Sequence, residues 1–584
     1  MDSGIYLIKH GKPFWEPGDM LLIKNDPKYN EQWPRPLVSY ERMYEVKEPK
    51  RLVHKNDGKS HAQLPEGTPF GLVGTSSLYK RESAPGGKIQ EGSVTSVSLQ
   101  KTPDSWYWSS WRTNWGLQGS DAGVYDNREI HAIRIVAQEP RTDIKGHGGA
   151  PLYANHALER LRILGEIPIR KFTGGKDVPL DPDGNPDTSF LAKIPANQSF
   201  TFQMIDKEGM TLTMAQTWHQ VRPGEARYNC GGCHAHSQKP TPFEATAAAK
   251  PEYAIFDLTS DKTPLLTDKA HDESTQKWDS ADETGIRYVK AGVVNVEYHR
   301  DIRPILARSC VACHTNSSKQ PAGGLVLDDD SSGNQPAFGH DGGPDVSVPN
   351  AYFRIASWKR YTEAPVGSML TPQAASPYIT KFQARRSYLV WKLYGKRLDG
   401  WTNDDFPSLK TIGDLKSLRK GDALIAKLNY EDPKLLREYL RDHNCDRDLT
   451  GLIMPPPEAV KSGKVKPLTS EDRRMIVRWI DLGCPLDLDF DPKQPQRRGN
   501  GWMLDDQRPT LALTEPRAGV NGPLSRVLVG MSDYGTGLDP ESFTVVADFA
   551  VDGAAAGENL AKKFKALPEN RWELRLAKPI AELP

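Results

Sequence analysis

Short segments that alternate apolar and polar residues dominate the first half of the chain, and Gly, Pro, Asn and Asp separate them. A period of two residues is typical of a β-strand with one buried face, whereas a helix needs apolar residues three and four positions apart. The pattern therefore predicts a series of short strands, at residues 4–8, 20–24, 70–73, 131–136, 161–169, 200–204 and 210–214.

Helical periodicity is found later in the chain. Apolar residues at 302, 305 and 306 predict a short helix, and Pro304 fits its first turn, where a missing N–H costs nothing. Thr469 is an N-cap residue before an amphipathic segment with apolar residues at 475, 476, 479 and 480, and Gly483 marks its end. We also expect helical segments near residues 387–394 and 435–440.

Alternation returns after residue 500, where strands are predicted at 510–513, 525–529, 543–549 and 571–576. Short strands joined by turns in a segment of this length predict a small antiparallel β-sandwich of the immunoglobulin-like type.

Length and composition limit what the chain can be. A chain of 584 residues is too long for one hydrophobic core, so several domains are expected. The 76 basic residues nearly balance the 75 acidic ones, which gives no reason to propose a nucleic acid or an anionic membrane as a partner. No apolar run approaches the roughly 20 residues of a transmembrane helix. We predict a multidomain protein that consists of a strand-and-loop region (1–85), a β-rich domain (86–262), a linker (263–292), a mainly α-helical domain with a large insertion (293–495) and the C-terminal sandwich (505–584).

The candidate chemistry lies in the six cysteines. Four of them form two CxxCH motifs, Cys230-Gly-Gly-Cys233-His234 and Cys310-Val-Ala-Cys313-His314. In this motif the two thiols add to the vinyl groups of a haem, and the adjacent histidine becomes the proximal iron ligand. The sequence therefore predicts two covalent haem c groups, held by these six residues.

Two CxxC pairs can also form a structural zinc site. Pairs of that kind usually lie about 15–20 residues apart. Here Cys233 and Cys310 are much further apart, and a histidine follows each pair. Haem is therefore the favoured interpretation.

Candidates for the sixth ligand of the second haem lie between the two predicted helices. A helix before CxxCH and a helix at the end of the domain are the two ends of a cytochrome c domain, and Met454-Pro-Pro-Pro457 lies on the loop between them. A methionine thioether on a loop that prolines hold extended is how His/Met cytochromes complete their iron site. We favour Met454, with His443, His340 and His299 as rivals.

The far side of the first haem has several candidate ligands. His236 and His219 are nearest in sequence to the proximal His234, and His147 and His156 lie in a Gly-rich stretch. If one of them binds the iron, the haem only transfers electrons. If none does, the iron keeps an open position for a small-molecule ligand, and the chain is an enzyme.

Haem attachment through CxxCH takes place outside the cytoplasm, so we expect a periplasmic or otherwise extracytoplasmic protein. That environment is oxidising, so Cys445 and Cys484 can form a disulfide, although two unrelated buried thiols fit their spacing equally well. The first ten residues lack the features of a signal peptide. We therefore expect the export signal on sequence missing from this chain, and a truncated N-terminus.

The first motif also carries a family resemblance. Residues 194–202 and the segment from Trp218 to His234 resemble the middle domain of the hydrazine synthase alpha subunit family. The segments 301–306, 454–457 and 478–485 are similar to the cytochrome c domain that follows it in that family. The resemblance covers roughly residues 100–490. It implies a haem-binding middle domain, a cytochrome c domain and, in the first residues of the chain, the last strands of a β-propeller.

Two positions depart from that family. Its middle-domain haem is the catalytic one, ligated by a tyrosine four residues past the motif histidine, where this chain has Gln238. Its second haem is ligated by two histidines, where this chain offers Met454. We therefore predict a dihaem c-type cytochrome that transfers electrons with a redox partner protein or the subunits of a larger complex. The alternative is a haem enzyme that acts on a small, nitrogen-containing molecule at the first haem.

Overall fold

The computed structural model divides the chain into two compact units, residues 1–54 and 55–584. The residues that it describes are 4–8, 19–26, 28, 31, 39, 41–42, 45, 55–80, 122–123, 125–139, 160–169, 179–215, 218–228, 230, 239–274, 282–290, 295–336, 345–356, 376, 378–410, 417–419, 448–486, 509–517, 521–533 and 537–581.

The first unit contains an antiparallel hairpin. β1 (Ile5–Ile8) pairs with β2 (Met20–Lys24), which confirms both predicted strands. The apolar side chains of the hairpin are exposed, among them Leu7 at 54% and Ile23 at 57%. A two-stranded hairpin is at best marginally stable alone in water. The described strands of this unit therefore contribute little burial to its stability.

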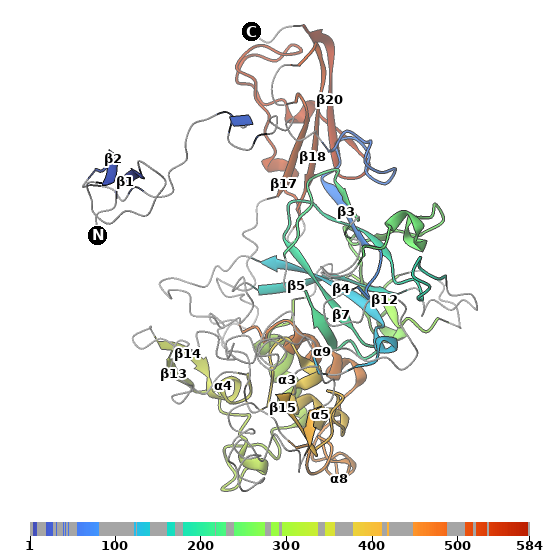
Figure 1. The fold of residues 1–584 in the computed structure, drawn as a ribbon, viewed down its shortest axis with the longest axis vertical. Helices are drawn as coiled ribbons and strands as arrows, with labels where there is room; N and C mark the ends of the chain where they lie inside the picture. The colour runs from blue at the N-terminus through green and yellow to red at the C-terminus, as the bar shows by residue number, and fades with distance from the viewer. Residues whose placement is uncertain are drawn as a thin grey trace. The chain divides into compact units, whose positions relative to one another are not determined.

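The second unit contains two four-stranded sheets that share a hydrophobic core. Figure 1 labels β4, β5 and β7 of one sheet and β3 of the other. Ile135 and Ile167 from one sheet and Val73 and Ile194 from the other belong to the same buried cluster. The four strands predicted between residues 131 and 214 are confirmed in the first sheet. Its order is β5-β4-β7-β8, with bounds Arg160–Pro168, Ala132–Glu139, Phe200–Ile205 and Thr211–Met214. The second sheet has the order β10-β6-β3-β9, with bounds Phe256–Asp257, Phe190–Pro195, Phe70–Thr75 and Ala226–Arg227.

Two segments have more structure than their sequence suggests. We grouped residues 70–73 with the N-terminal region, but β3 pairs with β6 and β9 and so belongs to the β-rich domain. The predicted linker contains an antiparallel hairpin, formed by β11 (Thr263–Leu266) and β12 (Ile286–Val289). Each of these strands is four residues long. β11 is buried at all four positions, so its sequence Thr-Pro-Leu-Leu does not alternate between apolar and polar residues.

The helices lie in residues 295–486. A π-helical turn, η8 (Tyr298–Ile302), leads into α3 (Arg303–Ser309). α9 (Ser470–Asp481) begins at Thr469, whose hydroxyl accepts a hydrogen bond from the N–H of Asp472 in a capping box. Both predicted helices are confirmed, as is α5 (Tyr388–Tyr394), whereas residues 435–440 lie outside the described residues. The same segment contains α4 (Asn350–Ala356), α8 (Pro457–Lys461) and two hairpins, β13–β14 (Ser332–Pro336 and Asp345–Pro349) and β15–β16 (Asp405–Lys410 and Ser417–Arg419).

Aromatic side chains pack the first and last of these helices together. The ring of Tyr298, just before α3, lies 5.2 Å from the ring of Tyr352 and 5.9 Å from that of Trp479 on α9. All three side chains are fully buried. The two ends of the helical segment therefore share one core, as expected for a cytochrome c domain, although the complete cytochrome c fold stays a prediction.

Single-turn 3-10 helices occupy several connections. They are η3 (Asn127–Glu129), η5 (Phe243–Ala245), η6 (Ala247–Ala249), η7 (Lys269–His271), η9 (Ala322–Gly324), η10 (Ala384–Arg386), η11 (Pro540–Ser542) and η12 (Ala561–Lys563). Among the described residues, no helix combines the length and the apolar character that crossing a bilayer requires.

The C-terminal region is one antiparallel sheet of four strands, in the order β17-β18-β20-β19. The second sheet of an immunoglobulin-like sandwich is not found in the described residues 509–581. The predicted strand at 543–549 is wrong, because the N–H of Val545 donates to the side chain of Asn559 rather than to a neighbouring strand. This loop covers one face of the sheet instead. The bounds of the strands are Thr510–Glu515, Leu524–Ser532, Arg571–Ile580 and Lys565–Leu567.

Gly530 on β18 lies where the C-terminal sheet meets the segment before β3. A Cβ added there would collide with the carbonyl oxygen of Gly67 and lie 3.0 Å from the backbone nitrogen of Pro69. Because backbone atoms cannot move aside cheaply, we expect Gly530→Ala to lower the free energy of unfolding by about 1–3 kcal/mol. Urea denaturation measures this loss. Gly522→Ala is the matched control, since nothing lies within 4 Å of its added Cβ. Equal effects of the two substitutions would contradict the close contact.

Candidate functional site

The second CxxCH motif continues α3 by one turn. The N–H of Cys310 donates to the carbonyl of Leu306 at 2.9 Å, and the N–H groups of Cys313 and His314 both donate to the carbonyl of Cys310 at 3.1 Å. The two thiols and the imidazole are therefore carried on one hydrogen-bonded turn. Such a turn has the spacing that attachment of a haem through two thioethers requires.

The surroundings of His314 fit a ligand to iron. Its carbonyl accepts the N–H of Leu327 at 2.8 Å, which fixes the backbone of the residue. Its Nδ1 is enclosed by the chain. Burial holds the pKa of His314 below its usual value, and the nearby backbone of Leu325 and Ala322 opposes this shift. The imidazole is therefore held in the neutral state that metal ligation needs.

The thiol of Cys310 faces the hydrophobic core. It packs against the buried cluster that contains Leu306 and Trp479. Burial raises the pKa of Cys310 to about 11. Cys313, one turn later, is half-buried. An apolar wall behind the thiols and a fixed histidine beside them fit the attachment of a haem at the edge of this core.

The loop that carries Met454 is packed onto the same body. The N–H of Met454 donates to the carbonyl of Lys392, at 2.8 Å, on α5. After α8 the chain returns to the last turn of α3, where the N–H of Lys466 donates to the carbonyl of Arg308 at 3.1 Å. Arg308 also pairs with Asp472 on α9. The loop and the second CxxCH motif thus belong to one packed assembly, and ligation by Met454 stays a prediction.

Several candidate residues lie outside the described residues, so their roles stay predictions. Of the first motif only Cys230 is described, and it is exposed. Cys484 is buried, but its predicted disulfide partner is not described. The candidates outside the described residues are Cys233, His234, His236, His147, His156, His340, His443 and Cys445, together with Gln238.

Two of the described histidines pack against aromatic rings. The ring of His219 lies 5.8 Å from that of Phe200, and the two residues also exchange backbone hydrogen bonds. The ring of His299 lies 5.3 Å from that of Tyr298, and burial, with Arg303 nearby, lowers its pKa to about 4. In the part of the chain that the structure describes, no three His, Cys, Asp or Glu side chains group as a metal site.

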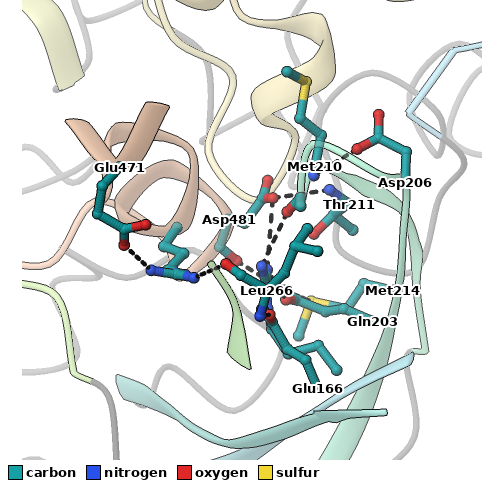
Figure 2. A network of polar contacts seen from close by, with 12 residues as sticks. Glu166, Gln203, Asp206, Met210, Thr211, Met214, Leu266, Glu471 and Asp481 are labelled. Carbon is teal, nitrogen blue, oxygen red and sulfur yellow. Dashed lines mark hydrogen bonds and ion pairs between the residues drawn. The ribbon is translucent and has the colours of Figure 1, made fainter. Parts of the chain in front are cut away.

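A buried charge network connects the first sheet with the helical segment (Figure 2). Its centre is Arg134 on β4, which is fully buried. Arg134 donates from Nε to Glu166 at 2.6 Å, and from its terminal nitrogens to Gln203 at 3.0 Å and to the carbonyl of Gly209 at 2.9 Å. One terminal nitrogen lies 3.7 Å from a carboxylate oxygen of Asp481. One guanidinium therefore lies between two buried carboxylates.

Asp481 reaches this network from the last residue of α9. Its carboxylate accepts the N–H of Thr211 and the N–H of Ala384, both at 2.8 Å, and its carbonyl accepts the side-chain amide of Gln203 at 2.8 Å. Burial raises the pKa of Asp481 to about 6, against the opposing effect of Arg134. The end of α9 is thus hydrogen-bonded to β7 and β8 of the sheet.

The pKa of Glu166 is shifted in the opposite direction. Burial alone would raise its pKa, but Arg134 and Arg478 outweigh burial and hold the pKa below its usual value. Glu166 also accepts the N–H of Leu266 at 2.6 Å. Arg478 on α9 donates to the carbonyl of Leu266 at 2.6 Å and to Glu471 at 2.7 Å. The hairpin β11–β12 is therefore fixed between the sheet and α9.

The sequence reasoning missed this network, although one signal was present. Arg134 stands between Ile133 and Ile135, and Glu166 between Gly165 and Ile167, in strands that read as buried. Charged residues inside apolar strands are rarely buried unless they are paired. The signal indicates a buried pair but does not identify Asp481, which is far away in the sequence.

Comparison with known proteins identifies one domain of the chain. Residues 128–235 match the model of the hydrazine synthase alpha subunit middle domain. This range includes β4 to β9 and ends one residue after His234. In this range the chain is similar to the hydrazine synthase alpha subunit family. The resemblance inferred from the sequence is thereby confirmed.

Hydrazine synthase subunit alpha of Kuenenia stuttgartiensis is 25% identical to this hydrazine synthase alpha-like chain over 341 residues, which are 53% of this chain and 32% of that protein. The chain thus spans about a third of the length of this curated relative. The solved structure of Kuenenia stuttgartiensis hydrazine synthase covers 72% of this chain and 44% of the solved chain, with 17% identity and a TM-score of 0.36.

Replacing Arg134 tests the charge network. Arg134→Met leaves Glu166 and Asp481 buried without their cation, so we expect a loss of about 3–5 kcal/mol in the free energy of unfolding. Urea denaturation of the full chain measures it. Arg128→Met is the control, because Arg128 pairs with Asp126 on the surface with its side chain 61% exposed, and its loss should cost about 0–1 kcal/mol. A loss below about 1 kcal/mol for Arg134→Met would contradict the role of the network.

Proposed function

We propose that the chain is a c-type cytochrome with two covalently bound haems that transfers electrons within a larger redox complex. The observation that carries this proposal is the second CxxCH turn at the end of α3. Its cysteine Cys310 packs on the core formed with α9, and the imidazole of His314 is enclosed beside the backbone of Leu325 and Ala322.

The chain's own residues would hold the haem as follows. Cys310 and Cys313 would attach it through thioethers, and His314 and Met454 would be the protein ligands of its iron. Haem bound in this way supplies a one-electron iron couple whose potential depends on the axial ligands. The packed body formed by α3, α5 and α9 holds these residues in a fixed arrangement and excludes water from the core behind them. A fixed site changes little on electron transfer, which suits a carrier of electrons.

A second function is supported by the match over residues 128–235. The matched domain ends at the first CxxCH motif, and the relative is by name a hydrazine synthase subunit. The alternative proposal is a redox enzyme that acts on a small nitrogen-containing molecule at the first haem. Carbon monoxide binding to the reduced protein separates the two proposals. Binding at one haem per chain indicates an open iron site and favours the enzyme.

We also propose a cellular compartment and a class of partners from the chemistry of the motifs. Haem attachment through CxxCH implies an extracytoplasmic compartment. The relative is named as a subunit, so partners in this chain's complex would be further subunits or a redox protein.

Haem attachment is tested by mass. Expressed full length with the machinery for c-type haem attachment, the protein should gain the mass of two haems and show haem peroxidase activity on a denaturing gel. Cys310→Ser combined with Cys313→Ser should remove one of the two haems, because both thioethers at that site are lost. Cys484→Ser, which changes a cysteine outside the motifs, should retain both. A mass equal to that of the bare polypeptide would rule out the proposed function.

Ligation by Met454 is tested by spectroscopy. The oxidised protein should show the near-infrared sulfur-to-iron band, and Met454→Ala should abolish it and lower the potential of one haem, because a thioether favours reduced iron. Met475→Leu, on α9, should keep the band. If Met454→Ala leaves the band and both potentials unchanged, the ligand is another residue, and His443 is the first to test.

A further inference from the structure

Lysines are concentrated around the loop that carries Met454. Residues 388–396 and 448–468 contain five lysines and two acidic residues, whereas the whole chain has 76 basic and 75 acidic residues. The lysines are Lys392, Lys396, Lys461, Lys464 and Lys466, and the acidic residues are Asp448 and Glu458. The balanced composition of the chain thus hides a local excess of positive charge.

The last turn of α5 lies against this loop. The N–H of Met454 donates to the backbone carbonyl of Lys392, and the Nζ of Lys392 donates to the carbonyl of Thr450 at 2.7 Å. A Cβ added to Gly395 would lie 3.3 Å from the Cβ of Ile453. Because a backbone carbonyl carries no net charge, the ammonium group of Lys392 keeps its positive charge beside the loop.

Three further lysines lie between α8 and the second CxxCH motif. Lys461, Lys464 and Lys466 are exposed, whereas Val465 among them is buried. The N–H of Lys466 donates to the carbonyl of Arg308 at 3.1 Å, in the last turn of α3. Within the part of the chain that the structure describes, none of the three lysines forms an ion pair. Their charges are therefore held at a fixed place on the surface and remain available to a partner.

The same loop exposes one large apolar side chain. Leu452, two residues before Met454, is 62% exposed. A small apolar centre inside a charged rim is the usual composition of a protein–protein contact. A single leucine buries too little apolar area to hold a membrane surface, which takes an amphipathic helix or a lipid chain. The unpaired lysines favour a protein of opposite charge, because complementary charges accelerate the encounter.

We propose that the five lysines and Leu452, together called the lysine surface, dock an acidic redox protein that exchanges one electron with the haem on Cys310 and Cys313. The proposal rests on the proposed function, because it requires that haem. Every bond stays in place during the exchange. The partner loses one electron while the iron changes from Fe(III) to Fe(II), or the reverse.

A bacterial flavodoxin, which is an acidic one-electron carrier, is the probe. Its hydroquinone becomes the semiquinone as it reduces the oxidised protein, and loss of the near-infrared sulfur-to-iron band reports reduction of the second haem. Biosensor measurements with oxidised flavodoxin give the association and dissociation rates without electron transfer. At an ionic strength of about 0.01 M the Debye length is roughly 30 Å, so the association and reduction rates should be high there and fall as salt is added.

Reversal of three charges tests the surface. Lys461→Glu, Lys464→Glu and Lys466→Glu in one variant should lower the association and reduction rates about 10-fold or more at low salt, because steering is lost. This difference should shrink at about 1 M salt, where the Debye length is roughly 3 Å. The matched control reverses three exposed lysines of the C-terminal region, Lys562, Lys565 and Lys578. It changes the net charge equally and should change each rate less than about twofold.

Leu452→Ala tests the apolar centre of the surface. Charges steer the encounter, whereas apolar contact holds the complex together. Leu452→Ala should therefore raise the dissociation rate of flavodoxin and leave its association rate nearly unchanged.

The outcomes separate this proposal from the proposed function. A protein that carries both haems overturns the lysine surface alone if both triple variants slow association equally, or if association does not depend on salt. Vesicles of phosphatidylglycerol that bind as tightly as flavodoxin, and are lost from the Lys461, Lys464 and Lys466 variant, also overturn it and assign the surface to an anionic membrane. Absence of haem overturns the proposed function and the lysine surface together.

Discussion

The buried guanidinium of Arg134 is the constraint on which the second unit depends. A charge without access to water must have all its partners in place, because removing one leaves the rest buried and uncompensated. Its partners come from separate stretches of the chain: Glu166 from β5, Gln203 from β7, Gly209 from the turn before β8, and Asp481 from α9. Sliding of α9 against the sheet would break several of these contacts at once. The residues that lead to the first CxxCH motif and the helix that supports the second are therefore held in one body.

The apolar core connects the same two parts of the molecule as the charge network. One buried cluster includes Met210 and Leu265 from the β-rich part and Ile305 and Trp479 from the helical part. Apolar contacts alone tolerate small shifts, since many side-chain arrangements bury a similar area. The charge network accepts one register only, because each hydrogen bond has a defined direction and length. Apolar packing thus stabilises the contact between the sheet and the helical segment, and the charge network fixes its register.

Local signals explain what the sequence could predict. The strands β4, β5 and β7 and the helices α3 and α9 have clear periods, turn residues or caps within a few positions, so their existence follows from neighbours in the chain. The pairing of β3 with β6 joins residues more than a hundred positions apart and leaves no local trace. Residues 543–549 alternate like a strand, but bonds to Asn559 and Leu560 hold them as a covering loop. The CxxCH residues could be found because their spacing itself carries the chemistry, whereas an arginine in a strand shows that a partner exists without showing which residue it is.

Two carboxylates that share one arginine respond to pH in opposite ways. Glu166 has a lowered pKa, so its contribution to stability is present at neutral pH and is lost as the pH falls through its folded pKa. Asp481 has a pKa raised to about 6 from a usual value of 3.8, so its contribution is complete below the usual value and is lost as the pH rises through the folded one. The shorter distance from Arg134 to Glu166, together with the second cation Arg478 beside Glu166, accounts for this difference. Because the ion pair between Arg134 and Glu166 does not depend on Asp481, the charge of Asp481 can change while this pair within the sheet stays intact. A fixed interface and a titratable group are therefore compatible within one network.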